Sequence, residues 1–293
     1  MAAPSEKLDL GAVLSEWPLI QGGARANVPL ELKTARHQEL VYQVRHGGPF
    51  DVAFIGDSIV QTLCDFGDKY AGHQKTWDRH LLPRRAINLG HDGFRIEHLL
   101  WNLNDGELDF PVSPKVFVLQ VGTNNCDDRN FTPVHTAREI YGGTRAIVRA
   151  IRRRHPTSRI LVLRMFPRGG DNDVAVSLPA FHSSQPCITT CRVAGELTRR
   201  LADNRHVYWL DVNQIFLRPD GSVDSSMLWD LLHPSPAGAE AWVRHILPTV
   251  DRLLEEAAAE CDVVRLFPWL DDLVRSFCEW GHCMLCSKHR QRL

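Results

Sequence analysis

The sequence has 293 residues, of which 44% are apolar and 24% are charged, with a formal net charge of -1. This is the composition of an ordinary globular protein with one sizeable domain, and the balanced charge argues against nucleic-acid binding. The N-terminus lacks the basic and apolar regions of a signal peptide, and no apolar run is long enough to span a bilayer. The eight cysteines are too sparse for a disulfide scaffold, so we expect a cytoplasmic protein.

The first predicted elements are a helix over residues 28–46 and a buried strand over 51–56. The helix is stopped by Gly47-Gly48-Pro49, and the strand is a short apolar run that ends in glycine. Similar runs rich in Val, Ile and Leu follow at 85–90, 115–122, 159–166 and 206–211. Continuous apolar runs are typical of parallel strands that are covered on both faces.

Helical patterns fill the intervals between these strands. They are clearest at 94–103, 134–154, 190–204 and 236–258. The alternation predicts an α/β fold with three α/β/α layers around a five-stranded parallel sheet. A long loop is expected at 168–188, and the basic stretch at 145–155 is interpreted as the C-terminal half of a helix.

We divide the chain into three segments: a helical lead-in (1–49), the main α/β domain (50–258) and a helical C-terminal extension (259–293). The extension contains a cluster of possible zinc ligands, namely Cys278, His282, Cys283, Cys286 and His289. Their spacing matches no standard zinc module, so buried or palmitoylated thiols are the favoured interpretation and no metal is expected.

Ser58 is the first candidate for a reactive side chain. It follows the strand at 51–56, so it lies on a strand-to-helix turn at the carboxyl edge of the sheet, where ligands of doubly wound folds bind. Unpaired N–H groups at the start of the helix would hold an oxyanion beside it. The alternative is that Asp57 or Ser58 only caps this helix.

Asp230 and His233 form the second candidate block. They come after the last strand and directly before a helix with Ser235 as its cap and Pro236 at its first position. Because they are three residues apart, we expect both side chains on the same side of one turn. The carboxylate could then orient the imidazole and stabilise its protonated form.

Two further blocks follow the second and third strands. Residues 88–93 (NLGHDG) can present a backbone N–H of Gly90 or Gly93, and residues 122–125 (GTNN) can present the side-chain amide of Asn124. Each block alone is an ordinary turn. Together the four blocks supply a nucleophile, a base with its orienting acid, and donors for an oxyanion.

The four blocks, in this order, resemble those of the SGNH (GDSL-type) hydrolase family, and within it the intracellular platelet-activating-factor acetylhydrolase Ib catalytic subunits. The resemblance covers residues 30–257 and implies a flavodoxin-like fold. The stretches that carry it are FIGDSIVQ (54–61), INLGHDGF (87–94), HLLWNLNDGELD (98–109), VLQVGTNN (118–125), GGTRAIVRAI (142–151), PRG (167–169) and WDLLHPSPAG (229–238).

The resemblance implies a serine esterase that works through an acyl-enzyme, with no metal and no organic cofactor. Ser58 would be the nucleophile, and Asp230 and His233 would complete the triad. The N–H groups of Ser58 and Gly93 and the Asn124 side chain would form the oxyanion hole. The expected substrate is a carboxylic ester with a short, acetyl-type acyl group, carried by a lipid or another small molecule.

The family also implies association as a homodimer and with a WD-repeat protein. Ile59 and Leu232 flank the implied catalytic residues and are candidate walls of the acyl pocket, although both could equally be core residues. Phe94 stands where the family usually has an acidic residue, which leaves open whether Gly90 or Gly93 is the oxyanion donor. A carbohydrate O-acetyl esterase and a catalytically idle binding scaffold are the alternatives, and the complete triad argues against the second.

Overall fold

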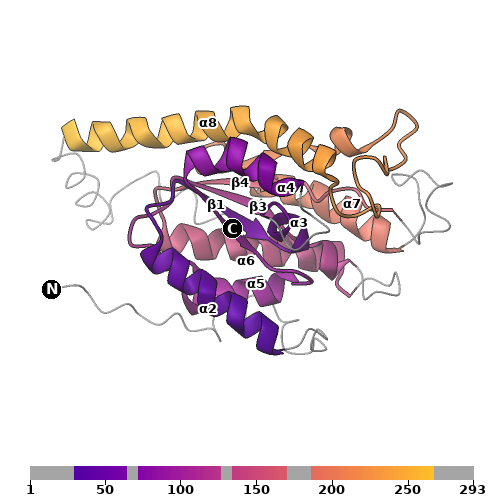
Figure 1. Ribbon diagram of the computed structural model, residues 1–293, viewed down its shortest axis with the longest axis horizontal. Helices are drawn as coiled ribbons and strands as arrows, with labels where there is room; N and C mark the ends of the chain where they lie inside the picture. The colour runs from indigo at the N-terminus through magenta and orange to yellow at the C-terminus, as the bar shows by residue number, and fades with distance from the viewer. Residues whose placement is uncertain (1–29, 65–71, 127–133, 170–185, 267–293) are drawn as a thin grey trace, which may run out of the picture.

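The computed structural model describes residues 30–64, 72–126, 134–169 and 186–266, which form a three-layer α/β/α sandwich (Figure 1). Five parallel strands build the central sheet in the order β2-β1-β3-β4-β5, which is the doubly wound order of flavodoxin-like folds. The strands are β1 (Val52–Gly56), β2 (Ala86–Gly90), β3 (Val116–Gln120), β4 (Arg159–Leu163) and β5 (Val207–Leu210). The predicted fold class and all five predicted strands are therefore confirmed.

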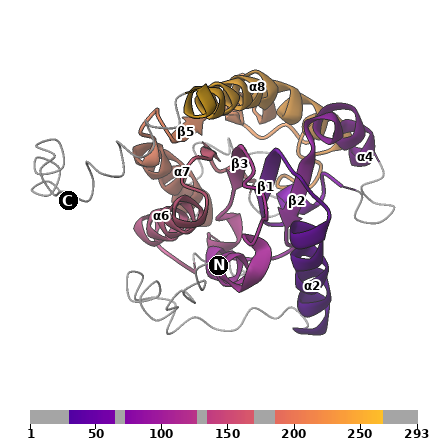
Figure 2. The same cartoon turned by 90° about the vertical axis from the view of Figure 1, so that its left-hand side faces the viewer.

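Helices cover both faces of the sheet (Figure 2). One face carries α2 (Leu30–His46), α5 (Ile96–Asn102) with its continuation η5 (Leu103–Glu107), α6 (Ala137–Arg154) and α7 (Pro186–Thr198) with η7 (Arg199–Leu201). The other face carries α3 (Ser58–Gln61), α4 (His73–Thr76), η3 (Trp77–Leu81), η4 (Leu82–Arg84), η8 (Asn213–Phe216) and α8 (Pro236–Leu266). Each helix predicted between residues 28 and 258 has a counterpart here, whereas the predicted helical extension lies outside the described residues from residue 267 onward.

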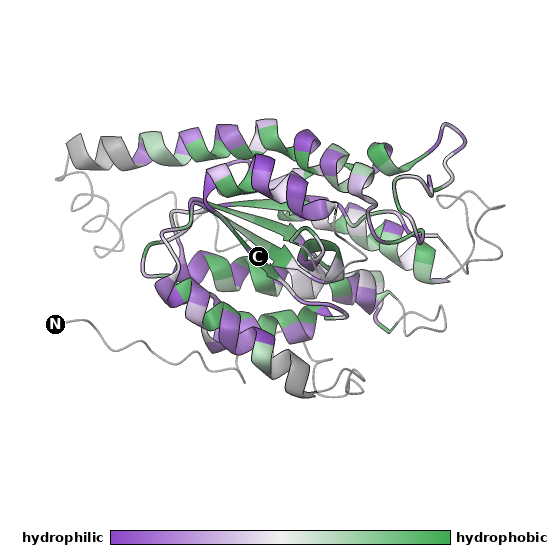
Figure 3. Ribbon diagram, in the orientation of Figure 1, coloured by the Kyte–Doolittle hydropathy of each residue, from purple (hydrophilic) through white to green (hydrophobic). Residues whose placement is uncertain are grey.

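The strands are mostly apolar (Figure 3), because each face of the sheet has its own core. In β1, the side chains of Ala53 and Ile55 join the core under α2, α5, α6 and α7. Val52 and Phe54, which alternate with them, join the core under α8. Since both faces are covered, the run cannot alternate between apolar and polar residues.

Several element boundaries, and one segment, differ from the prediction. The third and fourth strands end at Gln120 and Leu163, before the apolar runs end, because the chain turns into loops at the carboxyl edge of the sheet. The segment between Ser58 and Gly93 contains α4, η3 and η4, none of which the periodicity indicated. The last helix continues to Leu266, so the boundary that we predicted at residue 258 lies inside α8.

Close packing between the end of α3 and the end of β2 holds this short helix, and with it Ser58, against the sheet. A Cβ atom on Gly90 would lie 2.3 Å from Gln61 N and 2.7 Å from Gln61 Cα, and neither backbone atom can move alone. Asn88 strengthens the same contact, because its Nδ2 donates to Val60 O at 2.7 Å.

We therefore predict that Gly90→Ala lowers the free energy of unfolding by about 2 kcal/mol or more, as overpacked cores do. Gly195→Ala is the matched control, since its Cβ would lie 3.1 Å from a side-chain carbon of Arg164, inside a helix that favours alanine. Urea denaturation of both variants measures the difference. Equal stability of the two variants would contradict the tight α3–β2 contact.

Candidate active site

Ser58 lies at the first position of α3, at the carboxyl edge of the sheet. The capping role falls to Asp57, whose Oδ1 accepts the N–H of Ile59 at 3.0 Å. The Ser58 hydroxyl is therefore not needed as a cap and points to another partner. Ser58 is almost completely buried, with only 5% of the residue exposed.

The Asp230–His233 block is an irregular loop before α8 and not a helical turn. Asp230 Oδ1 accepts the backbone N–H groups of Leu232 at 3.1 Å and His233 at 2.7 Å. Leu231, between them, has a φ of 62°, in the left-handed region that a branched side chain rarely adopts. This turn, which periodicity could not predict, brings the two side chains together.

The three predicted triad residues form one chain of hydrogen bonds. Asp230 Oδ2 lies 2.7 Å from His233 Nδ1, and His233 Nε2 lies 2.9 Å from Ser58 Oγ. An ionised carboxylate only accepts, so Nδ1 carries the proton and Nε2 accepts from the serine hydroxyl. Burial opposes ionisation of Asp230, but the hydrogen bonds from His233 outweigh it and lower the pKa of this carboxyl. The arrangement can activate Ser58 as a nucleophile.

The predicted oxyanion donors surround the start of α3. The N–H groups of Ser58 and Gly93 donate to no acceptor in the described part of the chain, which leaves both available to a ligand. Gly93 has a φ of 68°, which favours glycine at this position. One N–H of the Asn124 side chain donates to Phe94 O at 2.8 Å and ties the loop after β3 to the loop after β2.

Gly90 differs from Gly93 in its hydrogen bonding. Its N–H donates to Asn88 Oδ1 at 2.9 Å, and its lack of a side chain serves the contact with α3. It therefore has no N–H to offer to a ligand. Of the two glycines that the sequence left open, the geometry favours Gly93.

The two candidate pocket walls lie in different surroundings. Ile59 has no exposed surface, because its side chain packs in the core under α8 with Val52 and Phe54 of β1, so the structure corrects its assignment as a pocket wall. Leu232 is half-buried beside His233 and packs only partly against the same core.

Three residues that the sequence analysis missed support the site. Gln61 Oε1 accepts the N–H of Asp92 at 2.6 Å, and the ring of Trp229 lies 6.4 Å from that of His233 at an interplanar angle of 21°. The buried His73 holds the loop after the triad through its Nε2, 2.9 Å from Pro234 O. Gln61 is three positions from Ser58, and Trp229 precedes Asp230, so proximity could have indicated both. Nothing marked His73 among fourteen histidines.

Two negative observations apply to the described residues only. None of their helices is long and apolar enough to cross a membrane. Within the same ranges, no group of three or more His, Cys, Asp or Glu side chains is arranged to hold a metal ion. The cysteine and histidine cluster at 278–289 lies outside the described residues, and so does most of the long loop predicted at 168–188.

Residues 54–241 match the GDSL-like lipase/acylhydrolase family, which covers more than half of the chain and all four blocks. The chain belongs to this family, and it is thus a member of a family of carboxylic-ester hydrolases. The resemblance on which the sequence analysis depended is confirmed.

Similar proteins agree with this membership. The chain is 33% identical over 208 residues to the platelet-activating factor acetylhydrolase IB subunit alpha1 of Homo sapiens, covering 70% of this chain and 78% of that protein. It is 30% identical over 226 residues to subunit alpha2 of Rattus norvegicus, covering 77% and 86% respectively. The fold matches that of a GDSL-like lipase from Bacteroides thetaiotaomicron with a TM-score of 0.53 and 13% identity, covering 78% of this chain and 97% of that one.

Asp57 gives a prediction on stability. Burial raises the pKa of this carboxyl to about 7, an effect that the N–H of Ile59 and the nearby His233 only partly offset. The native state therefore binds this proton more tightly than the unfolded state. The contribution of Asp57 to the free energy of unfolding should therefore fall by about 1.4 kcal/mol per pH unit as the pH rises from about 4 to 7.

Asp57→Asn keeps the oxygen that caps α3 and removes the ionisation. Relative to the variant, the wild type should lose stability as the pH rises through this window. Urea denaturation at several pH values measures the difference between the two proteins. A difference that stays constant with pH would show that Asp57 ionises normally in the native state.

Proposed function

We propose that this protein is a serine esterase that hydrolyses carboxylic esters with a short, acetyl-type acyl group through an acyl-enzyme on Ser58. The observation that carries the proposal is the hydrogen-bond chain from Asp230 through His233 to Ser58, with distances of 2.7 Å and 2.9 Å. Within a family of acylhydrolases, this geometry supports covalent catalysis by the serine.

The mechanism follows from the donors and acceptors. His233 Nε2 takes the proton of Ser58 as Oγ attacks the ester carbonyl, and Asp230 stabilises the imidazolium that forms. The oxyanion accepts from the N–H groups of Ser58 and Gly93 and from the side-chain amide of Asn124. His233 then protonates the leaving alcohol, and it later activates the water that releases the acid and restores the serine.

A short acyl group is favoured by the names of the curated relatives. They are acetylhydrolase subunits, although identity of 33% leaves the alcohol part of the substrate open. We therefore propose a lipid or another small molecule as the carrier of the ester.

Covalent labelling tests the nucleophile. The wild type should gain one adduct from a fluorophosphonate, seen as an increase in intact mass, and Ser58→Ala should gain none. Ser226→Ala is the matched control and should label like the wild type, because the Ser226 hydroxyl donates to Asp224 on an exposed turn. A folded wild type that stays unmodified would overturn the esterase proposal and favour a binding scaffold.

Acyl length is tested separately with a series of p-nitrophenyl esters from acetate to palmitate. The ratio kcat/KM should be highest for acetate and fall by about tenfold or more by octanoate, because each added methylene must displace packed side chains. A preference for long chains would show that the acyl pocket is larger than proposed, while leaving the nucleophile intact. Activity on acetylated sugars but not on acetylated lipids would assign the alcohol part to a carbohydrate.

A further inference from the structure

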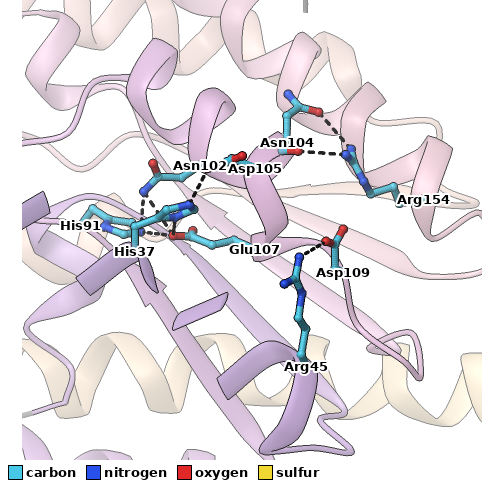
Figure 4. Close-up of polar contacts among 9 residues, drawn as sticks. All are labelled: His37, Arg45, His91, Asn102, Asn104, Asp105, Glu107, Asp109 and Arg154. Carbon is cyan, nitrogen blue, oxygen red and sulfur yellow. Dashed lines mark hydrogen bonds and ion pairs between the residues drawn. The ribbon is translucent and has the colours of Figure 1, made fainter. Parts of the chain in front are cut away.

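A buried polar cluster lies next to the loop that carries Gly93, away from the triad. It consists of His37 on α2, His91 directly after β2, Asn102 on α5, and Asp105 and Glu107 on η5 (Figure 4). His37, His91, Asn102 and Glu107 are each less than 9% exposed, and Glu107 is completely buried. A polar cluster this deep is costly unless its groups are paired, so its pairing indicates a specific use.

Glu107 is the centre of the cluster. Its Oε1 lies 2.8 Å from His37 Nδ1, 2.8 Å from His91 Nε2 and 3.2 Å from Asn102 Nδ2. Burial opposes ionisation of Glu107, but the hydrogen bonds from the two histidines outweigh it and lower the pKa of the carboxyl. The cluster therefore contains a buried carboxylate held by donors from three different elements.

His37 supplies the compensating charge. Its Nδ1 faces Glu107, and its Nε2 lies 3.1 Å from Asp105 Oδ2, so both ring nitrogens donate to carboxylates. Burial disfavours the imidazolium, but the hydrogen bonds to Glu107 and Asp105 outweigh it and raise the pKa of His37. The ion pair between α2 and η5 thus keeps Glu107 charged and able to hold His91.

His91 connects the cluster to two of the three proposed oxyanion donors, Gly93 and Asn124. Its N–H donates to Gly56 O at 3.0 Å, and its ring stacks on that of Phe94 with centroids 4.6 Å apart and planes at 17°. Phe94 N donates back to His91 O at 3.2 Å, which closes the turn that contains Gly93. Phe94 O accepts from Asn124 Nδ2 at 2.8 Å.

We propose that Glu107, with His37 and His91, is a positioning network that fixes the Gly93 turn and the Asn124 amide for the oxyanion. None of these side chains touches the triad, so they are positioning residues that act through Phe94 and the loop backbone. This inference rests on the proposed esterase function. Because an oxyanion exists only in the transition state, loss of the network should lower kcat and leave KM nearly unchanged.

Glu107→Gln is the most informative variant. Glu107 Oε2 is buried without a partner, so the amide nitrogen can take its place while Oε1 keeps its acceptor role. The variant then loses the charge, but not the shape, that holds His37 and His91. We expect kcat for p-nitrophenyl acetate to fall by roughly 10- to 100-fold, KM to stay within about twofold, and the rate of fluorophosphonate labelling to fall in parallel with kcat.

Asn104→Ala and Asp109→Asn are the matched controls, because they remove polar contacts of the same turn that do not reach His91. Asn104 Oδ1 accepts from Arg154 at 3.0 Å, and Asp109 pairs with Arg45 at 2.8 Å (Figure 4). Both variants should keep the kcat of the wild type. If all three variants lose activity alike, the cluster only supports the fold and the inference is wrong.

The outcomes separate the network from the esterase function itself. An inert wild type overturns both proposals, whereas an active wild type with an equally active Glu107→Gln variant overturns the network alone. A Glu107→Gln variant that melts earlier but keeps its kcat also overturns it. If circular dichroism shows that Glu107→Gln does not fold, His37→Gln is the second variant, because it removes the imidazolium that pairs with Glu107. This variant should still lower kcat by a few fold and leave KM unchanged.

Discussion

The hydrogen bond between His233 Nε2 and Ser58 Oγ, 2.9 Å long, joins residues 175 positions apart, and it can form only when the rest of the fold is in place. Ser58 depends on the contact of α3 with β2, and His233 depends on the loop that ends at α8. Both loops meet because the carboxyl ends of parallel strands lie at one edge of the sheet. The core on each face of the sheet thus determines the distance between the two reacting side chains.

Three buried or partly buried carboxyl groups around the site differ in how readily they ionise, and their hydrogen-bond partners explain the difference. Asp230 is paired with His233 and two backbone N–H groups, so it stays ionised. Glu107 is ionised because two histidines and Asn102 surround one of its oxygens. Asp57 has a single backbone donor, and burial therefore holds its pKa near 7. Burial alone does not decide whether a carboxyl is ionised, because its hydrogen-bond donors and the nearby charges also shift its pKa.

Phe94 stands where the resemblance led us to expect an acidic residue, and in the fold its side chain and carbonyl make specific contacts. Its ring stacks on His91 and its carbonyl receives the Asn124 amide. An aromatic residue at this point gives the turn an apolar surface against the buried polar cluster. The turn that carries Gly93 is thereby held from two sides, by Gln61 through Asp92 and by His91 through Phe94.

The sequence by itself determined the three layers, the five strands and the family to which the four blocks belong. Local patterns carry that information, because a strand covered on both faces must be apolar throughout, and because Ser235 and Pro236 mark the start of a helix. The candidate residues Ser58, Asp230 and His233 could be named from their places after strands. The sequence also indicated that a glycine at or just after the end of β2 would approach a ligand, but not which of the two.

Only the tertiary structure distinguishes those glycines, because the N–H of Gly90 is occupied by Asn88, whereas that of Gly93 has no acceptor among the described residues. The structure also shows that Ile59 lies in the core. It shows as well that Asp230 and His233 come together through an irregular loop in which Leu231 has a left-handed backbone conformation. The cluster around Glu107 has donors from α2, from the loop after β2 and from α5, which lie apart in sequence. Such contacts depend on how elements pack, and no periodicity along the chain records them.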